Sequence, residues 1–313
     1  LPICFLLTGG TVSYGELEDQ AARTAARLIA EGVRPGDRVA LQAEKTPEVI
    51  VIYLATLKAG AVFLPLNAAY TASEVDYFQG DAEPRVFITD PPAYVREAAG
   101  FAPLETAIPR TAGDLASLIY TSGTTGRSKG AMLSHGNLAA NALALHAAWG
   151  FTPDDVLLHA LPVFHVHGLF VALHCALLSG APMIWLPKFS DGEVLAGLAK
   201  ATVMMGVPTF YTRLLANPAF TRDAAAGVRL FISGSAPLLP STFAEFEART
   251  GQRILERYGM SEAVIITTNP LDGERVAGSV GYPLPGVELR IGGGEETGVI
   301  EIRGPSVSGG YWR

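Results

Sequence analysis

The sequence has few cysteines, no cluster of basic residues and no long uncharged apolar run, and each absence excludes a class of protein. Its two cysteines, Cys4 and Cys175, form neither a CxxC pair nor a Cys/His set with metal-ligand spacing. A disulfide scaffold is therefore excluded, and a reducing compartment, which we expect to be the cytoplasm, fits best. With a formal net charge of −7 and no basic run, we expect neither nucleic acid nor a membrane surface as a partner. No apolar run reaches the roughly 20 residues that span a bilayer.

The chain is large enough for one substantial folded unit. Of its 313 residues 49% are hydrophobic and the mean hydropathy is +0.28, so a large ordered core can form. It begins with the apolar segment 1–7 and without methionine. Because that segment has neither a basic region nor a small-residue cleavage site, we interpret it as an incomplete start and not as a signal peptide. The sequence leaves the oligomeric state open.

Apolar runs alternate with helical stretches along most of the chain. Continuous apolar strands joined by helices predict an α/β fold with mostly parallel sheets covered by helices. After Glu262 the helical stretches stop and short β-type segments follow. We therefore expect α/β subdomains over residues 1–262 and a small β subdomain over residues 263–313. The expected strands are 38–41, 62–64, 86–88, 156–160, 182–186, 203–207, 228–232, 264–268, 287–291 and 299–303, and the expected helices include 47–59, 73–80 and 168–178.

A loop rich in hydroxyls and glycines follows an expected strand at 115–119. Glycines let backbone N–H groups approach an anion, hydroxyls add donors, and a lysine adds positive charge. The pattern therefore predicts a phosphate cradle, although the same residue types also dominate ordinary surface turns. The candidate phosphate ligands are Thr121, Ser122, Gly123, Thr124, Thr125, Gly126 and Lys129.

The spacing in this loop differs from that of a Walker A loop, where the lysine directly follows the second glycine and a helix begins at once. Here Gly126 and Lys129 are three positions apart, and an apolar run at 130–134 precedes the start of a helix at Ser134. This order of strand, loop and strand resembles the signature loop of the adenylate-forming superfamily, which comprises acyl-CoA synthetases, nonribosomal adenylation domains and luciferases. The resemblance implies that the loop holds the β- and γ-phosphates of ATP.

A second segment, 256–262, combines an aromatic ring, a glycine, a hydroxyl and a carboxylate, and resembles the superfamily's Y-G-x-[ST]-E motif at every position. The resemblance implies that Tyr258 stacks on adenine, that Ser261 donates to the α-phosphate and that Glu262 ligates Mg²⁺, which prefers oxygen ligands. By itself the segment would more simply be a strand end followed by a helix capped by Ser261. The expected nucleotide contacts are Glu256, Arg257, Tyr258, Gly259, Met260 and Ser261.

A third segment, 231–238, reads as a strand that runs into small residues and then into a helix starting at Pro237. In the superfamily the equivalent loop flanks adenine and the acyl group, which implies those contacts for Gly234, Ser235 and Ala236.

The C-terminal segment 298–312 resembles a structural motif of the superfamily, with Val299 in place of a glutamate. The superfamily's sequence continues with a ribose-binding aspartate and a smaller domain that carries a catalytic lysine, and neither occurs before Arg313. The resemblance therefore implies the large N-terminal domain with its C-terminal lid domain absent.

The segment 159–170 closely resembles malonyl-CoA synthetases, as do segments 205–215 and 269–276. Two histidines, His165 and His167, alternate there with apolar residues. Zinc is disfavoured because no further ligand lies at a suitable spacing. We expect His167 to lie near a substrate carboxylate and His165 to position the loop.

Malonate carries a second carboxylate, which needs a cation once it leaves water, and a guanidinium is the natural partner. Arg275 is our first candidate, followed by Arg229 and His167. Arg229 could equally be structural, since an arginine leading this strand is common in the superfamily, and Arg275 could be a solvated turn residue.

Together these features predict a ligase that uses ATP and Mg²⁺ to convert malonate to malonyl-AMP and then transfers the acyl group to coenzyme A. The predicted catalytic residues are Thr121, Lys129, Glu262 and His167, which act by positioning and electrostatics. No protein nucleophile is required, and Cys175 is expected to be a buried apolar side chain. Two alternatives stay open. One is an adenylating enzyme for another small or aromatic acid, without a cation in the acyl pocket, and the other is a nucleotide-binding domain without catalysis.

Overall fold

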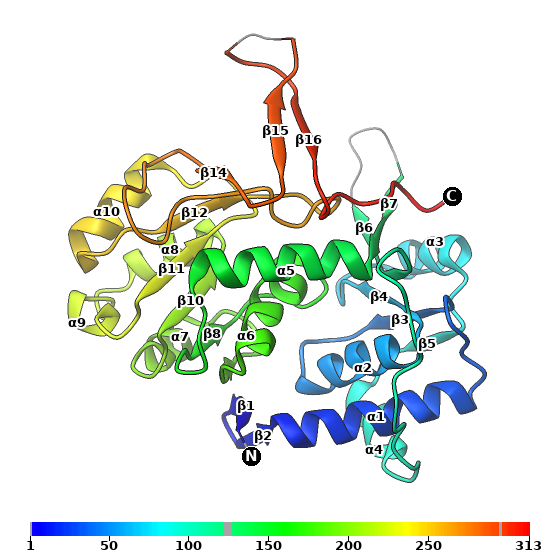
Figure 1. The fold of residues 1–313 in the computed structure, drawn as a ribbon. Helices are drawn as coiled ribbons and strands as arrows, with labels where there is room; N and C mark the ends of the chain where they lie inside the picture. Colours follow the sequence, from blue (N-terminus) through cyan, green and yellow to red (C-terminus); the bar gives the residue numbers. More distant parts are fainter. Residues whose placement is uncertain (1, 122–126, 294–295) are drawn as a thin grey trace.

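The computed structural model describes residues 2–121, 127–293 and 296–313. It confirms an α/β architecture in which helices cover two mostly parallel sheets, and a β-hairpin projects from the body (Figure 1). The expected phosphate ligands 122–126 lie outside the described residues.

The N-terminal sheet has the strand order β5-β3-β4-β6-β7, with every pair parallel except β6 and β7. Its central strand β4 is buried along its whole length, as its apolar run predicts. Helix α3 begins with a capping box formed by Thr71 and Glu74. The elements are β3 (Arg38–Gln42), β4 (Val62–Leu66), β5 (Val86–Ile88), β6 (Leu115–Thr121), β7 (Lys129–Ser134), α1 (Tyr14–Ala30), α2 (Pro47–Lys58), α3 (Ala72–Ala82) and α4 (Pro91–Ala98).

The larger sheet has the order β14-β13-β12-β11-β10-β8-β9-β1-β2, and its central strands from β12 to β1 run parallel. Its strands are β1 (Ile3–Leu7), β2 (Gly10–Ser13), β8 (Leu157–His159), β9 (Met183–Trp185), β10 (Val203–Gly206), β11 (Leu230–Ser233), β12 (Leu255–Tyr258), β13 (Thr267–Thr268) and β14 (Tyr282–Pro283). Its helices are α5 (His135–Trp149), the π-helix η1 (His167–Ala172), α6 (Leu173–Ser179), α7 (Asp191–Leu198), α8 (Pro208–Ala216), α9 (Arg222–Ala225) and α10 (Pro240–Thr250).

Two helix starts differ from the sequence-based expectation. Helix α10 begins at Pro240 and not at Pro237, because Leu239 still has extended backbone and Pro240 takes the first helical position. The helix expected over 168–178 opens as the π-helix η1 before it continues as α6. Helix α5 begins as expected after Ser134, whose side chain accepts the Asn137 N–H.

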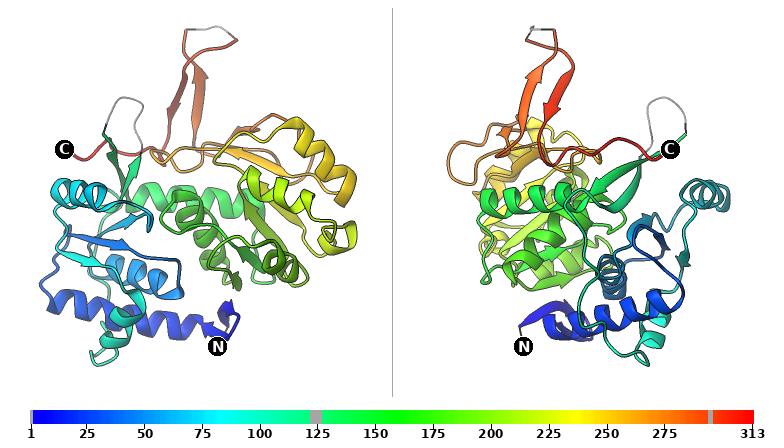
Figure 2. Two further views of the ribbon diagram at one scale, coloured as in Figure 1. Left: turned by 180° about the vertical axis from the view of Figure 1, so that it is seen from behind. Right: turned by 45° about the vertical axis from the view of Figure 1, so that its right-hand side comes forward.

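The C-terminal region is divided between two sheets. Strands β13 and β14 extend the larger sheet beyond β12, whereas β15 (Glu288–Ile291) and β16 (Ile300–Arg303) form a separate antiparallel pair. The two views of Figure 2 agree that this hairpin projects away from both sheets. The expected boundary between residues 262 and 263 thus falls within the connection between two paired strands, β12 and β13.

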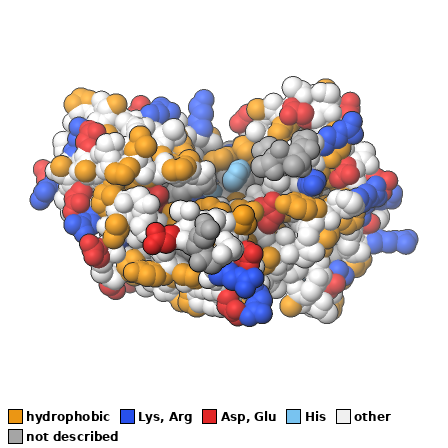
Figure 3. All heavy atoms as spheres, turned by 90° about the horizontal axis from the view of Figure 1, so that it is seen from above, with side chains coloured by type: hydrophobic (Ala, Val, Ile, Leu, Met, Phe, Trp, Pro, Cys, Tyr) orange, Lys and Arg blue, Asp and Glu red, His pale blue; other side chains and the backbone are white. Residues whose placement is uncertain are grey.

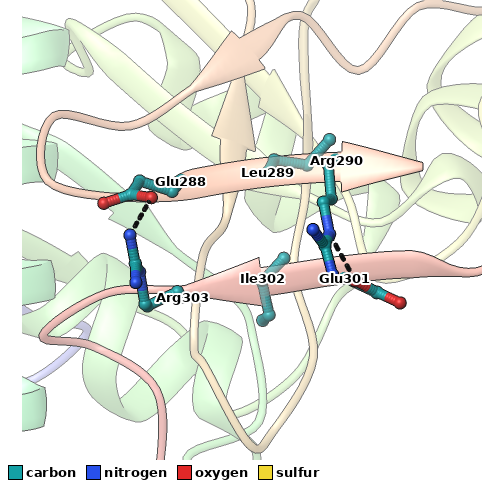
Figure 4. A pocket seen from close by; sticks show the side chains of 6 residues that line it. All are labelled: Glu288, Leu289, Arg290, Glu301, Ile302 and Arg303. Atoms are coloured by element: carbon teal, nitrogen blue, oxygen red, sulfur yellow. Dashed lines mark hydrogen bonds and ion pairs between the residues drawn. The ribbon is translucent and has the colours of Figure 1, made fainter. Parts of the chain in front are cut away.

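A hollow of about 380 Å³ beside this hairpin is lined by Leu289, Ile302 and two cross-strand ion pairs. Arg290 pairs with Glu301 and Arg303 with Glu288, so the charged groups there partner one another across the ladder (Figure 4). These side chains are largely exposed, and such ion pairs contribute little stability and leave no charge free for a ligand.

Both cysteines are buried free thiols, and Cys175 lies in α6 as expected. Burial raises the pKa of the Cys4 thiol to about 12. Within the described ranges, the model contains no helix with the length and apolarity needed to cross a membrane.

Candidate functional site

The candidate site lies where the parallel strands of the larger sheet end. The segments that follow β8, β11 and β12 carry the two histidines, the small residues 234–236 and the motif 256–262. In an open parallel sheet the loops at the carboxyl ends of the strands meet at one edge, which is where ligands bind. Figure 3 shows a depression between two lobes of the molecule with a histidine side chain in it.

His167 is buried at the start of η1 and is 2% exposed. Its Nδ1 lies 3.2 Å from the hydroxyl of Ser235, and its Nε2 has no hydrogen-bond partner among the described residues. Ser235 itself has a φ of +68°, a left-handed conformation that is uncommon for a residue with a side chain. A strained residue and an unpaired polar atom therefore meet at the carboxyl edge of the sheet. His165, two residues earlier, is exposed.

Arg257 lies beside this pair on β12 and is 4% exposed. Its Nε and Nη2 have no hydrogen-bond partner within the described part of the chain. Burial lowers the pKa of the guanidinium to about 9, so it remains mainly charged at neutral pH. A buried charge without a partner is costly, and this one is suited to receive an anionic ligand.

The environment of His167 keeps its ring neutral. Burial, followed by the positive charge of Arg257, lowers the pKa of His167 well below its ordinary value. A neutral ring can donate from one nitrogen and accept at the other, which suits hydrogen bonding to a carboxylate placed between His167 and Arg257.

The two arginines expected to bind the distal carboxylate have other partners. Arg275 donates to the carbonyls of Arg253, Pro270 and Leu271 at 2.6, 3.2 and 2.7 Å. Because each of its three nitrogens already donates to a carbonyl, this side chain ties the 270–275 loop to the segment before β12, which favours a structural role for Arg275 over binding of the distal carboxylate.

Arg229 is likewise held by the fold. Its guanidinium makes two hydrogen bonds of 2.7 Å to Asp155 and also donates to the carbonyls of Trp149 and Gly150. Of the two possibilities that the sequence left open, the structure therefore supports the structural one. Arg257 was expected from the sequence to contact the nucleotide. The sequence signal for a ligand at this point is that two charged residues, Glu256 and Arg257, stand next to each other in a four-residue strand that is mostly buried.

The phosphate end of the site is built by β6, β7 and the chain end. Thr121 and Lys129 are cross-strand partners on β6 and β7, so the ladder brings the two ends of the expected phosphate loop together. The chain end lies beside β7: Trp312 N–H donates to the Gly130 carbonyl at 2.8 Å. Tyr311 then donates to Oε1 of Glu262 at 2.7 Å, and its ring centroid lies 5.4 Å from Nζ of Lys129. The predicted metal ligand and the predicted phosphate cation therefore flank one tyrosine.

The other predicted nucleotide contacts differ in exposure. Glu256 is buried, accepts the Leu238 N–H weakly at 3.4 Å through Oε1, and has a pKa that burial raises. Its Oε2 has no hydrogen-bond partner among the described residues. Gly234 is buried, Tyr258, Gly259 and Ser261 are partly exposed, and Ser235, Ala236 and Met260 are exposed. Ser261 caps no helix, because residues 261–263 form a turn.

A magnesium ion fits this end of the site. Mg²⁺ binds through one or two carboxylates together with substrate phosphates, and Glu262 presents a carboxylate next to the phosphate loop. Within the described ranges, no group of three or more His, Cys, Asp or Glu side chains is placed to form an all-protein metal cage. The chain therefore offers a site that a nucleotide would complete.

Comparison with known proteins agrees with this arrangement. The family model described as AMP-binding enzyme matches residues 3–312. The chain belongs to the AMP-binding enzyme family. A mitochondrial malonate–CoA ligase from Mus musculus is 32% identical over 97% of this chain and 64% of its own length.

Two solved structures of this family are also similar. ATP-bound MatB from Rhodopseudomonas palustris is 50% identical with a TM-score of 0.94, covering 99% of this chain and 69% of that chain. A malonyl-CoA ligase in a ternary product complex with methylmalonyl-CoA and AMP is 36% identical with a TM-score of 0.88, covering 99% and 70%. The chain spans 64%, less than two thirds, of the length of the Mus musculus ligase that it matches.

Proposed function

We propose that the whole protein is an acid–thiol ligase that activates malonate with ATP and transfers the malonyl group to coenzyme A. The observation that carries this proposal is the buried guanidinium of Arg257, whose Nε and Nη2 have no partner among the described residues, beside the neutral ring of His167. The similarity to a malonate–CoA ligase and to a malonyl-CoA ligase supports the same substrate class.

In this proposal Arg257 pairs the distal carboxylate of malonate, and His167 donates a hydrogen bond to the bound acid. The two oxygens of a carboxylate can each accept a hydrogen bond from a planar guanidinium, which gives a bidentate ion pair. The reacting carboxylate is thereby directed toward the nucleotide at the edge formed by residues 234–236 and 258–262. The proposed adenylate contacts are Gly234, Ser235, Ala236, Glu256, Tyr258, Gly259, Met260 and Ser261.

At the other end of the site, Thr121 and Lys129 hold the leaving pyrophosphate, and the tyrosine-bound carboxylate of Glu262 would hold Mg²⁺. When bound, Mg²⁺ supplies positive charge that neutralises the phosphates. The substrate carboxylate displaces pyrophosphate at the α-phosphorus, and the thiol of coenzyme A then displaces AMP from the acyl-adenylate. The protein contributes orientation and preorganised charge, and neither buried cysteine takes part.

A pyrophosphate-release assay on the full-length protein with malonate, methylmalonate, acetate and an aromatic acid tests this proposal. We expect turnover to be fastest with the two dicarboxylates and to require coenzyme A for product formation. Preferred turnover of acetate or of the aromatic acid would overturn the substrate assignment and favour an acyl-CoA synthetase for another acid. Binding of ATP without pyrophosphate release from any acid would overturn the catalytic assignment.

A further inference from the structure

A lysine that has no carboxylate partner among the described residues is buried between the two sheets. Lys45 follows β3 of the N-terminal sheet, is 7% exposed, and reaches the end of β8 in the larger sheet. Its Nζ lies 2.8 Å from Nδ1 of His159 and 2.7 Å from the carbonyl oxygen of the same residue. It also lies 4.1 Å from the ring centroid of Trp185, the strand partner of His159. Its partners in the described part of the chain are thus a histidine and an aromatic face.

The second ring nitrogen of His159 makes a further hydrogen bond, to the backbone of Gly168. His159 is 1% exposed, and its Nε2 lies 3.0 Å from the carbonyl oxygen of Gly168. A carbonyl can only accept, so Nε2 must carry the proton. Burial and then the charge of Lys45 lower the pKa of His159 well below its usual value, so the ring is neutral and Nδ1 must accept from Lys45. Lys45 therefore selects the tautomer of His159 that anchors Gly168.

Gly168 is the residue directly after His167, and its position leaves no room for a side chain. A β-carbon built on Gly168 would lie 2.1 Å from the carbonyl oxygen of Pro162, so the backbone here packs against the preceding loop. This is also the first turn of the π-helix η1, a type of turn that commonly occurs at functional sites. The orientation of His167 thus depends on how its neighbour's carbonyl is held.

We propose that Lys45 and His159 form a positioning relay that fixes the η1 turn and thereby directs His167 toward Ser235 and Arg257. Lys45 donates to His159, His159 donates to the Gly168 carbonyl, and His167 presents its ring to the acid. This inference rests on the proposed function for its kinetic consequence, whereas the relay itself is a property of the fold. Neither residue contacts substrate.

Nitrogen NMR of ¹⁵N-histidine-labelled protein tests the relay directly, because the chain has only six histidines. The expected spectrum shows His159 as the neutral tautomer protonated at Nε2. Lys45 and the exposed Lys188 line one hollow of about 300 Å³. Lys45→Met should shift the ring signals of both His159 and His167, whereas Lys188→Met should shift neither. A His159 ring protonated at Nδ1, or a His167 signal that is the same in wild type and Lys45→Met, would overturn the relay.

Kinetics of the full-length enzyme test the consequence. Outer-shell partners that orient a metal-bound histidine contribute about 10–100-fold. By analogy we expect a loss of about that size in malonate kcat/KM for Lys45→Met, with the KM for ATP changed less than about twofold. If Lys45→Met fails to fold, the variants His159→Gln and His159→Leu replace it.

The Gln side chain keeps one donor and one acceptor, so His159→Gln should retain more activity than His159→Leu. Equal losses of malonate kcat/KM in the two variants would overturn the proposal. A wild-type enzyme that does not use malonate would refute the proposed function, while the NMR result would still decide the relay.

Discussion

A β-carbon added to Gly234 would lie 2.4 Å from Cζ of Arg257, a separation that real β-carbons do not reach. The absence of a side chain at Gly234 therefore creates the space that the guanidinium occupies next to the carboxyl end of β11. This relationship joins two segments, 231–238 and 256–262, that are far apart in the sequence.

Gly234→Ala should displace Arg257 and lower malonate kcat/KM by at least about 10-fold. Overpacking of this kind also destabilises a folded protein by about 1–3 kcal/mol, because the guanidinium or the strand must move. Steady-state kinetics and urea unfolding measure the two effects. Gly227→Ala is the matched control, because its β-carbon would make only an ordinary contact at 3.7 Å. Equal effects of the two substitutions would show that Gly234 has no special relation to Arg257.

Arg257→Met should lower malonate kcat/KM by an amount that corresponds to roughly 2–5 kcal/mol of transition-state stabilisation. The reason is that the distal carboxylate is left desolvated and without its cation. Propionate has no distal charge, so its turnover should change much less and the preference for malonate should collapse. The unfolding free energy should stay constant or rise, since the substitution removes an unpaired buried charge.

Arg275→Met is the control for this experiment, because its guanidinium binds only backbone carbonyls among the described residues. It should lower stability without altering the ratio of malonate to propionate turnover. A loss of that ratio in Arg275→Met but not in Arg257→Met would return the carboxylate to Arg275.

Arg229→Met should destabilise the fold by about 1–3 kcal/mol, because Asp155 is 3% exposed and loses both hydrogen bonds to its cation. This is less than the 3–5 kcal/mol expected for a fully buried pair, since the Arg229 side chain is 35% exposed. Urea unfolding at pH 7 measures the loss. No change in the unfolding midpoint would mean that Asp155 is adequately solvated without its partner.

The pair of Arg229 and Asp155 also predicts how the free energy of unfolding changes at acid pH. Burial raises the pKa of Asp155, but hydrogen bonds from Arg229, Thr202 and the Thr152 N–H together hold it below its ordinary value. A carboxyl whose folded pKa is depressed contributes stability above its unfolded pKa of about 3.9, and this contribution is lost as the pH falls through the folded pKa. Arg229→Met should therefore flatten this part of the acid limb of a stability curve. An unchanged acid limb would contradict the assignment.

The buried His174 predicts a second loss of stability on acidification, in a pH range above that of Asp155. Burial lowers its pKa to about 4, against about 6.5 in an unfolded chain. The unfolded state therefore binds more protons between these values, so stability that is present above pH 6.5 is lost as the pH falls toward 4. In His174→Gln, which cannot titrate but can still bond the Tyr53 hydroxyl, the unfolding free energy should fall less between pH 7 and pH 5. An equal fall in wild type and variant would contradict this prediction.

Local patterns were sufficient to predict most of the elements. The apolar runs that became β3, β4, β5 and β10 and the serine that caps α5 depend on residues a few positions apart. The errors occurred where local signals compete. Pro237 and Pro240 both suit a helix start, and the left-handed Ser235 and extended Leu239 place the start at the second proline.

The sequence by itself determined the order of strands and helices, the family motifs and the presence of hydroxyls, a lysine and a carboxylate for a nucleotide site, because these are properties of neighbouring residues. Only the tertiary structure decided which arginine is free to bind an acid. Arg229 lies 74 positions from Asp155, and the acceptors of Arg275 come from its own loop and from Arg253, so the fold itself supplies their partners. Arg257 lies on a strand whose neighbours offer its Nε and Nη2 no acceptor among the described residues. The difference between these arginines depends on which carbonyls and carboxylates the folded chain brings within reach of each guanidinium, which no local pattern specifies.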